Sequence, residues 1–312
     1  MSETRTDAVT PVEELAEGRT DDYIVERVVR RRRSFSRVWS RHKLGIIGLV
    51  MVGIIVLSAL LGPVLLPIDP NAEDLTNRLM PLFTQTNHVL HVFGTDALGR
   101  DVFARVLAGS RASLGVVLSG LVLGLVIGVT LGLIAGFYGR WVDNVVMRFV
   151  DTQLAIPVLI SAMFVAATLG TGYWNTAVTL GVATWPLYAR LIRAEVLKLR
   201  EEDYTAAAIA LGARDGRVLL RHILPNLVGT LFVVASLELG TLVLTESSLS
   251  YLGFGLQPPN ATWGSMIGDG QGYIFVDPLL SIVPGVFIMV TVLGLNFVGD
   301  WLRDVFDRSS AE

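Results

Sequence analysis

The chain has 312 residues, of which 52% are hydrophobic and 17% charged, and its mean hydropathy is +0.57. Soluble domains carry about 25% charged residues, so this composition indicates a membrane protein. The net charge of −3 says little by itself, whereas the lack of cysteine excludes disulfides, thiol nucleophiles and cysteine-ligated metal or iron–sulfur sites.

Residues 1–43 divide into an acidic and a basic part. Residues 1–26 are polar and acidic with little to bury, which predicts a mobile tail. Residues 27–43 interleave Arg and Lys with apolar side chains such as Phe35 and Trp39. This pattern favours an amphipathic elbow helix on the anionic lipids of the inner leaflet over a plain basic flank of the first span. Nucleic-acid binding is not expected for so short a basic run beside a membrane.

Charge-free stretches predict six membrane spans, because about 20 apolar residues cross a bilayer. Residues 44–68 and 112–139 give the first two. Residues 152–189 are nearly twice as long as one span requires, and a turn at 170–175 divides them into the third and fourth. The last two spans are residues 226–251 and residues 278–299.

The positive charges predict the orientation, because cytoplasmic segments are rich in Lys and Arg. With the N-terminus inside, only four of the 25 Lys and Arg residues fall outside: Arg78, Arg100, Arg105 and Arg111. Both termini and the charged stretch 200–227 are therefore expected in the cytoplasm.

The stretch 200–227, REEDYTAAAIALGARDGRVLLRHILPNL, is charged although it lies between two apolar segments, so it must sit in water. Acidic residues ahead of residues 205–211 favour a short helix there, and Gly212 lets that helix end in a left-handed conformation. Three consecutive alanines leave the helix nearly bare, so another protein can approach closely. A second helix is expected to be closed by Pro225. Its predicted apolar face is Val218, Leu219, Leu220, Ile223 and Leu224.

This arrangement resembles the cytoplasmic signature loop of permease subunits of binding-protein-dependent ABC importers, which is roughly E-A-A, three residues, Gly, nine residues, I-x-L-P. The matching residues are Ala207, Ala208, Gly212, Leu224 and Pro225. The sequence departs from the pattern at Ala206, where the family has Glu, and at His222, where it has Ile. A solvated hairpin without a partner is the alternative interpretation.

Further segments resemble dipeptide and oligopeptide permeases in the same order along the chain. They are FGTDALGRD (93–101), GSRASL (109–114), WVD (141–143) with Arg148, Asp151 and Pro157, LSYLGFG (249–255) and ATWG (261–264). The likeness covers most of residues 44–306. The group includes peptide, nickel and glutathione importers.

The resemblance implies an all-α integral membrane protein with six transmembrane helices and the type I ABC importer permease fold, in the bacterial cytoplasmic membrane. Residues 44–306 would be the transmembrane domain and residues 307–312 a C-terminal tail. The implied partners are a second homologous permease, two ABC ATPases and an extracytoplasmic solute-binding protein. The residues expected to couple to an ATPase are Glu202, Asp203, Tyr204, Ala206, Ala207, Ala208, Gly212, Ala213, Arg217, Leu224 and Pro225.

No enzyme motif is found in the sequence: it has no H-E-x-x-H and no G-x-S-x-G, and neither Lys43 nor Lys198 lies in a phosphate loop. The chain is therefore expected to perform no bond chemistry, with ATP and Mg bound by the partner ATPases. His88 and His91 are three apart, a spacing more typical of surface residues than of metal ligands, so no metal site is predicted.

Glu238 and Glu246 lie inside the fifth predicted span, where an unpaired carboxylate costs about 2.5–3.5 kcal/mol. Together with Ser248 they are candidates for the translocation path or for the contact with the second permease. Alternatively, the hydroxyl groups of Ser247 and Ser248 satisfy Glu246 within the subunit. A rival function of another class is an ion-coupled carrier or channel that uses the two glutamates as a relay.

Outer segments carry further candidates. Asp96, Arg100 and Asp101 form either a docking surface for the binding protein or a local ion-pair network. Residues 257–278, which lack Lys and Arg, form either a re-entrant segment that meets the solute, which is favoured, or a lid. At the inner end of the third span, Arg148 and Asp151 are spaced for a structural ion pair.

Glycines recur every fourth residue through the second predicted span, at Gly120, Gly124, Gly128, Gly132 and Gly136. These positions share one helix face, so the stripe predicts a close helix–helix contact.

Overall fold

The structure is a computed structural model, and it describes residues 43–62, 68–86 and 89–309. The acidic tail, nearly all of the basic segment and His88 therefore lie outside the described residues. The long helices are Lys43–Gly62, α2 (Val102–Tyr138), α5 (Tyr173–Glu201), α8 (Leu224–Tyr251) and α10 (Leu279–Ser309). The shorter helices are α3 (Arg140–Leu154), α4 (Val158–Leu169), α6 (Asp203–Ala210), α7 (Asp215–Val218), α9 (Trp263–Gln271), the 3-10 turn η1 (Leu75–Asn77) and the π-helical turn η2 (Leu219–Ile223). Strands β1 (Thr84–Thr86) and β2 (Val89–His91) pair antiparallel.

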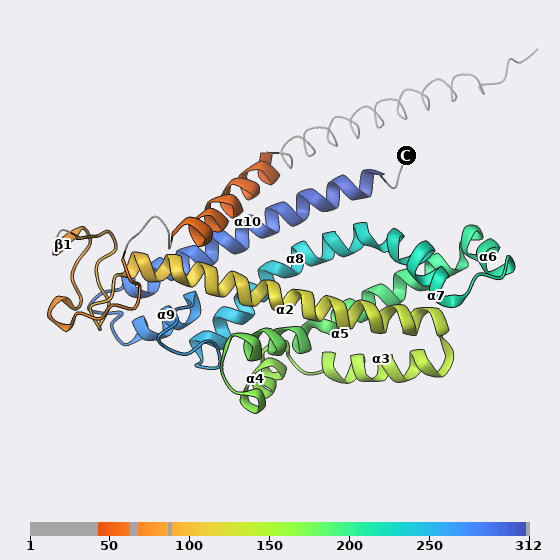
Figure 1. Cartoon of the computed structure of the whole chain (residues 1–312), viewed down its shortest axis with the longest axis horizontal. Helices are drawn as coiled ribbons and strands as arrows, with labels where there is room; N and C mark the ends of the chain where they lie inside the picture. The colour runs from red at the N-terminus through yellow and green to blue at the C-terminus, as the bar shows by residue number, and fades with distance from the viewer. Residues whose placement is uncertain (1–42, 63–67, 87–88, 310–312) are drawn as a thin grey trace, which may run out of the picture.

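The long helices run side by side (Figure 1), with the hairpin and α9 at one end and α6 and α7 at the other. Within the described residues, four helices are long and apolar enough to cross a membrane: Lys43–Gly62, Val102–Tyr138, Asp215–Tyr251 and Leu279–Val305. The bent pair α3–α4 would make a fifth span. Helix α5 contains the fourth predicted span and packs along α2. The count of six spans and the orientation stay predictions.

The second span begins earlier than predicted. Helix α2 starts at Val102 instead of residue 112, because the carboxylate of Asp101 caps it by accepting the backbone N–H of Ala104 at 2.6 Å. The helix then carries the buried, ion-paired Arg105. A search for charge-free stretches misses this turn, because it treats every arginine as solvated.

The third predicted span is not one continuous helix. Helices α3 and α4 meet at an angle of 96°, with Pro157 at the break, because proline lacks an amide hydrogen and disfavours a helical residue before it. Opposite the break, Pro186 deprives the carbonyl of Val182 of its usual helical donor, and the side-chain amide of Gln153 donates to that oxygen. One side chain thus links two helix irregularities.

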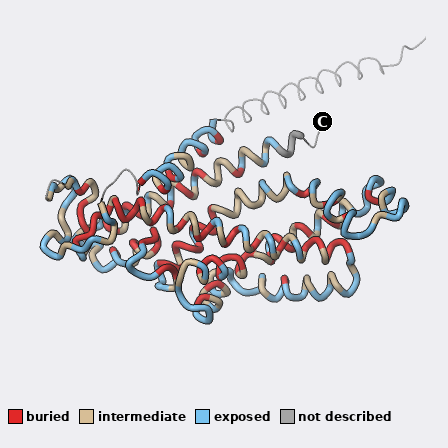
Figure 2. Tube along the Cα trace, in the orientation of Figure 1, coloured by how far each residue is buried: buried red, intermediate tan, exposed pale blue. Residues whose placement is uncertain are grey.

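The glycine stripe is the seam between α2 and α5, as predicted. A Cβ atom built at Gly120 would lie 2.7 Å from the Cβ of Leu180, and one at Gly128 would lie 2.6 Å from both the backbone oxygen of Trp185 and the Cβ of Tyr188. Gly132 and Gly136 meet α5 as closely. Figure 2 shows buried residues concentrated along this seam and exposed ones on the outward faces, where lipid would replace water.

Candidate functional site

Helix α6 projects from the end of the molecule opposite the hairpin (Figure 1). The backbone of Glu202 is extended (φ −69°, ψ 142°), which breaks α5 from α6. The buried hydroxyl of Thr205 donates to the backbone oxygen of Leu199 at 2.8 Å and ties α6 back to the end of α5. Gly212 has φ +79°, so α6 ends at a left-handed glycine as the sequence predicts.

The segment after α6 is anchored in the core. Val218 and Ile223 are fully buried in a cluster with residues of α2 and α5, among them Leu133 and Ile192. The segment that follows α6 is therefore packed against the ends of two long helices. The predicted apolar face is right for Val218 and Ile223, but Leu220 is exposed instead.

Pro225 does not close this unit, contrary to the prediction. It occupies the first turn of α8, directly after the π-helical turn η2, and residues 215–251 continue as one span through it. The second helix is therefore the start of the fifth span.

The exposed surface of α6 is formed largely by small and apolar side chains. Ala206 and Ala207 are exposed, and Ile209 and Leu211 are 47% and 89% exposed. Of the other predicted coupling residues, Glu202, Asp203, Tyr204, Gly212, Arg217 and Pro225 are exposed, while Ala208, Ala213 and Leu224 are partly buried. The sequence reasoning missed Ile209 and Leu211, although apolar residues in a loop that must sit in water were a signal for a contact surface.

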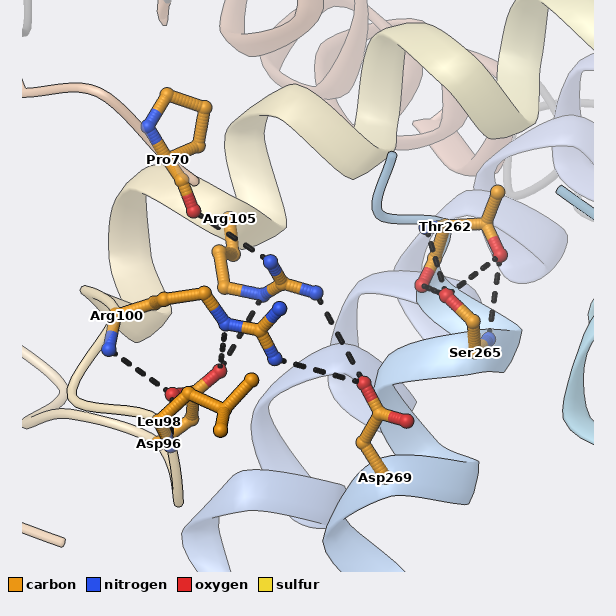
Figure 3. A network of polar contacts seen from close by, with 8 residues as sticks. All are labelled: Pro70, Asp96, Leu98, Arg100, Arg105, Thr262, Ser265 and Asp269. Carbon is orange, nitrogen blue, oxygen red and sulfur yellow. Dashed lines mark hydrogen bonds and ion pairs between the residues drawn. The ribbon is translucent and has the colours of Figure 1, made fainter. Parts of the chain in front are cut away.

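An ion-pair network lies at the other end of the molecule (Figure 3). The carboxylate of Asp96 accepts from the Nε of Arg100 at 2.7 Å and lies 3.6 Å from the Nε of Arg105. Both guanidinium groups also approach Asp269 of α9, at 3.8 and 3.9 Å. Arg100 and Arg105 are nearly buried, so the local-network interpretation describes their arrangement. Arg105 and Asp269 belong to it although the sequence did not indicate them, because their proximity is created by the fold.

Asp101 faces away from this network. Its second carboxylate oxygen lies 2.7 Å from Nδ1 of His91, and Nε2 of that ring lies 2.7 Å from the hydroxyl of Thr86. His91 is buried, so its interpretation as a surface residue was wrong. The imidazole instead joins the hairpin to the start of α2.

The segment 257–278 contains α9, which contacts α2, α8 and α10. The fully buried Trp263 donates its indole N–H to the backbone oxygen of Val106 at 3.2 Å, and its backbone N–H donates to the hydroxyl of Ser113 at 3.3 Å. The N-terminal half of α9 is therefore fixed to α2. Its other half packs on α8 and α10, where the hydroxyl of Tyr251 donates to the side chain of Gln271 at 2.8 Å, and Asp269 adds its longer contacts to the two arginines.

We expect this second attachment to depend on pH. Burial raises the pKa of Asp269 above the ordinary aspartate value, against the opposing charges of Arg105 and Arg100, while Asp96 adds to the rise. When pH falls, Asp269 is therefore neutralised earlier than an ordinary aspartate, and its attraction to the two arginines is lost. The chain has no cysteine, so the variant Gly272→Cys provides a single site for a spin label. The mobility of this label should increase on acidification.

Asp269→Asn should give the mobile spectrum at every pH, and Asp277→Asn should behave as the parent chain does. A label whose mobility is the same in Asp269→Asn and in the parent chain at neutral pH would contradict the attachment.

The two intramembrane glutamates differ in environment. Glu246 is 0% exposed and accepts from the hydroxyl of Ser250 at 2.7 Å and from that of Ser247 at 3.5 Å, whereas Ser248 donates to the backbone oxygen of Leu244. This geometry favours the alternative in which hydroxyl groups satisfy Glu246 within the subunit. Glu238 is only partly buried.

Ion pairs join α3 to α5. The carboxylate of Asp143 accepts from the Nε of Arg193 at 2.8 Å and also from its Nη2. Asp151 pairs with Arg190. The pair predicted between Arg148 and Asp151 does not form, because the fold offers Asp151 a cation from the facing helix.

Comparison with solved structures identifies the fold as that of a type I ABC importer permease. Two structures of the MetNI methionine ABC transporter in inward-facing conformations match with TM-scores of 0.52 and 0.53 at 22% and 21% identity. They cover 63% and 64% of this chain, and 94% and 96% of theirs.

Residues 128–311, more than half of the chain, match the family described as the binding-protein-dependent transport system inner membrane component, and the chain belongs to that family. It is thus a multi-pass inner-membrane transport component and not a catalytic subunit. Residues 32–81 match the N-terminal transmembrane domain of oligopeptide transport permease C.

Curated relatives are similar over most of their length. The dipeptide transport system permease protein DppC of Alkalihalophilus pseudofirmus is 38% identical over 88% of this chain and 89% of its own. A putative peptide permease of Brucella suis is 38% identical over 86% of this chain and 87% of its own. The nickel transport system permease protein NikC of Escherichia coli is 37% identical over 84% of this chain and 92% of its own.

Proposed function

We propose that this chain is one permease subunit of an ATP-driven importer, which passes di- or oligopeptides from an extracytoplasmic binding protein across the cytoplasmic membrane by alternating access. The observation that carries the proposal is α6: a bare, exposed helix with Ile209 and Leu211 at its tip, tied to the end of α5 by Thr205 and followed by a segment packed on α2 and α5. Such a helix suits a mechanical contact with another protein.

In this proposal two ABC ATPases hold ATP and Mg, and α6 docks on one of them. A second, homologous permease completes the membrane part, and the binding protein approaches the end that carries the hairpin and α9. The ATPase must bind one conformation of the permease more tightly than the other, because a partner with equal affinity for both would shift nothing. The buried anchor at Val218 and Ile223 supports such coupling, because it packs the segment that follows α6 against the spans.

The assignment of a peptide substrate rests on the names of relatives that are 38% identical to this chain. A nickel or a glutathione-like solute is the alternative within the family, since the nickel permease is similar to almost the same degree. Measuring the uptake of a labelled dipeptide, of Ni²⁺ and of glutathione by the complete transporter shows which of these solutes it transports.

Gly212→Val is expected to lower the ATP hydrolysis stimulated by loaded binding protein by about tenfold or more, because the stimulation passes through α6. A Cβ at Gly212 would touch nothing within 4 Å, but its φ of +79° is strained for a β-branched residue, so the change acts on the end of α6 alone. Stimulated hydrolysis in proteoliposomes measures the effect. Membrane insertion should be unchanged.

Gly216→Val is the matched control. It lies in α7, four residues further along the chain, has open space around its Cβ and has no positive φ, so stimulation should persist. Full stimulation in Gly212→Val would count against coupling through α6. Uptake at full speed without any ATPase would instead favour the ion-coupled carrier.

A further inference from the structure

The ion-pair network at the hairpin end leaves the guanidinium group of Arg105 short of acceptors. Arg105 is 3% exposed. The oxygens that it approaches are the backbone oxygen of Pro70 at 3.5 Å and carboxylate oxygens of Asp96 and Asp269 at 3.6 and 3.9 Å. A guanidinium group has five N–H donors, and buried donors normally find acceptors at about 2.9 Å. Within the described residues, this buried cation therefore makes long contacts only.

Neither carboxylate of the network completes these contacts. One oxygen of Asp96 accepts the backbone N–H groups of Leu98 and Arg100, each at 2.9 Å, and the other accepts from the Nε of Arg100 at 2.7 Å. Asp96 is therefore occupied by its own loop. Asp269 lies on the other side of the two guanidinium groups (Figure 3), and its side chain is 56% exposed.

A cavity adjoins both guanidinium groups. It encloses about 360 Å³, is partly open to solvent, and its lining includes Arg100, Arg105, Asp269, Met266 and Leu280. Its walls come from the loop before α2, the first turn of α2, α9 and the start of α10, so it lies at the hairpin end of the molecule. Arginine is always charged in proteins, and a carboxylate matches the geometry of its N–H groups. The cavity therefore suits a carboxylate that comes from outside the chain.

We propose that this cavity receives a carboxylate side chain of the extracytoplasmic binding protein, which Arg100 and Arg105 bind, and that Asp269 is an internal substitute for it until the partner docks. The long and exposed contacts of Asp269 make it easy to displace. A docked protein holds its side chain at this end of the molecule, whereas a solute only passes it. This inference rests on the proposed function, which supplies the binding protein.

The first test is the affinity of fluorescent, solute-loaded binding protein for the complete transporter in nanodiscs. Arg105→Gln should weaken the binding by about tenfold, which corresponds to about 1.4 kcal/mol, because a charge-assisted contact is lost. Asp269→Asn should tighten it by about threefold, because the change removes a competitor whose own exposed ion pairs are weak. If the network were only structural, Asp269→Asn would weaken the binding or leave it unchanged.

The charge-matched controls are Arg78→Gln and Asp277→Asn, at residues that do not line the cavity. Both should bind as the parent does, which excludes a general effect of net charge. Asp269 is exposed, so its variant remains informative even if Arg105→Gln does not fold. Weaker or unchanged binding in Asp269→Asn, equal tightening in Asp277→Asn, or full affinity in a folded Arg105→Gln would overturn the site.

The second test identifies the carboxylate. Arg105→Lys places a primary amine beside the cavity, and the two lysines of the chain, Lys43 and Lys198, do not line it. A water-soluble carbodiimide joins such an amine to a carboxylate in contact with it, and mass spectrometry of the digested complex identifies the linked pair. The amine should be linked to an aspartate or glutamate of the binding protein in the docked complex, and to Asp269 in its absence.

A link confined to this chain in the docked complex, a link to the peptide solute, or no link at all would overturn the assignment to the binding protein. If the unmodified transporter bound no loaded binding protein and showed no ATP-dependent peptide uptake, the proposed function itself would be refuted. The two failures are therefore distinguishable.

Discussion

Gly128→Val is expected to prevent α2 and α5 from packing and to leave little folded protein. The Cβ alone would lie 2.6 Å from the backbone oxygen of Trp185 and 2.6 Å from the Cβ of Tyr188. A backbone atom cannot move aside as a flexible side chain can, so the two helices must separate. Overpacking commonly costs about 1–3 kcal/mol, and the contact of Gly128 with rigid atoms on both sides places the cost at or above the upper end.

The separation would spread along the seam, because Gly124 and Gly132 on the same face make equally close contacts with α5. It would also disturb the buried cluster at the ends of these helices nearest α6, which anchors the segment after α6. We therefore expect loss of thermal stability in detergent together with loss of transport.

Gly53→Val is the matched control for this prediction. Gly53 lies in the helix Lys43–Gly62, and a Cβ built there meets nothing within 4 Å. The same β-branched side chain should leave the melting temperature of the purified protein nearly unchanged. A Gly128→Val protein that melts as the parent does would show that the α2–α5 contact in the membrane is looser than the seam described above.

The seam was predictable because it depends on one helix alone. Glycines with a period of four residues show which face of the helix has small side chains, whatever element packs against it. The short helix α6 and its left-handed end at Gly212 were predictable for the same reason: the acidic residues, the alanines and the glycine act locally.

Features that depend on two segments were not predictable. The pairing of Asp151 with Arg190, the burial of His91 against Asp101, and the approach of Asp269 to Arg100 and Arg105 each arise when distant elements fold together. The predicted helix bounds were wrong where an ion pair buries a charge, as at Arg105, and where a helix continues through a proline, as at Pro225. Counting charge-free residues cannot detect either case.

Leu211→Asp is expected to release the ATPase from the permease. Leu211 is 89% exposed at the end of α6, beside the exposed Ile209 and the bare alanine face. Burying a leucine against a partner contributes about 1.5–3 kcal/mol, and placing a carboxylate in an apolar contact adds a further cost. Together these predict that the ATPase binds at least about 30-fold more weakly, a factor that corresponds to about 2 kcal/mol.

Co-purification of the ATPase with the tagged permease in mild detergent measures this loss, and a titration of permease in nanodiscs with purified ATPase gives its size. The protein itself should stay folded, because an aspartate at so exposed a position disturbs no packing. Leu75→Asp provides the control, since Leu75 is 65% exposed in η1, next to the network at the opposite end. If Leu211→Asp retained the ATPase as well as Leu75→Asp does, the tip of α6 would not be the contact, and its exposed apolar residues would need another partner. If both variants lost the ATPase equally, the loss would report general damage instead of a docking surface on α6.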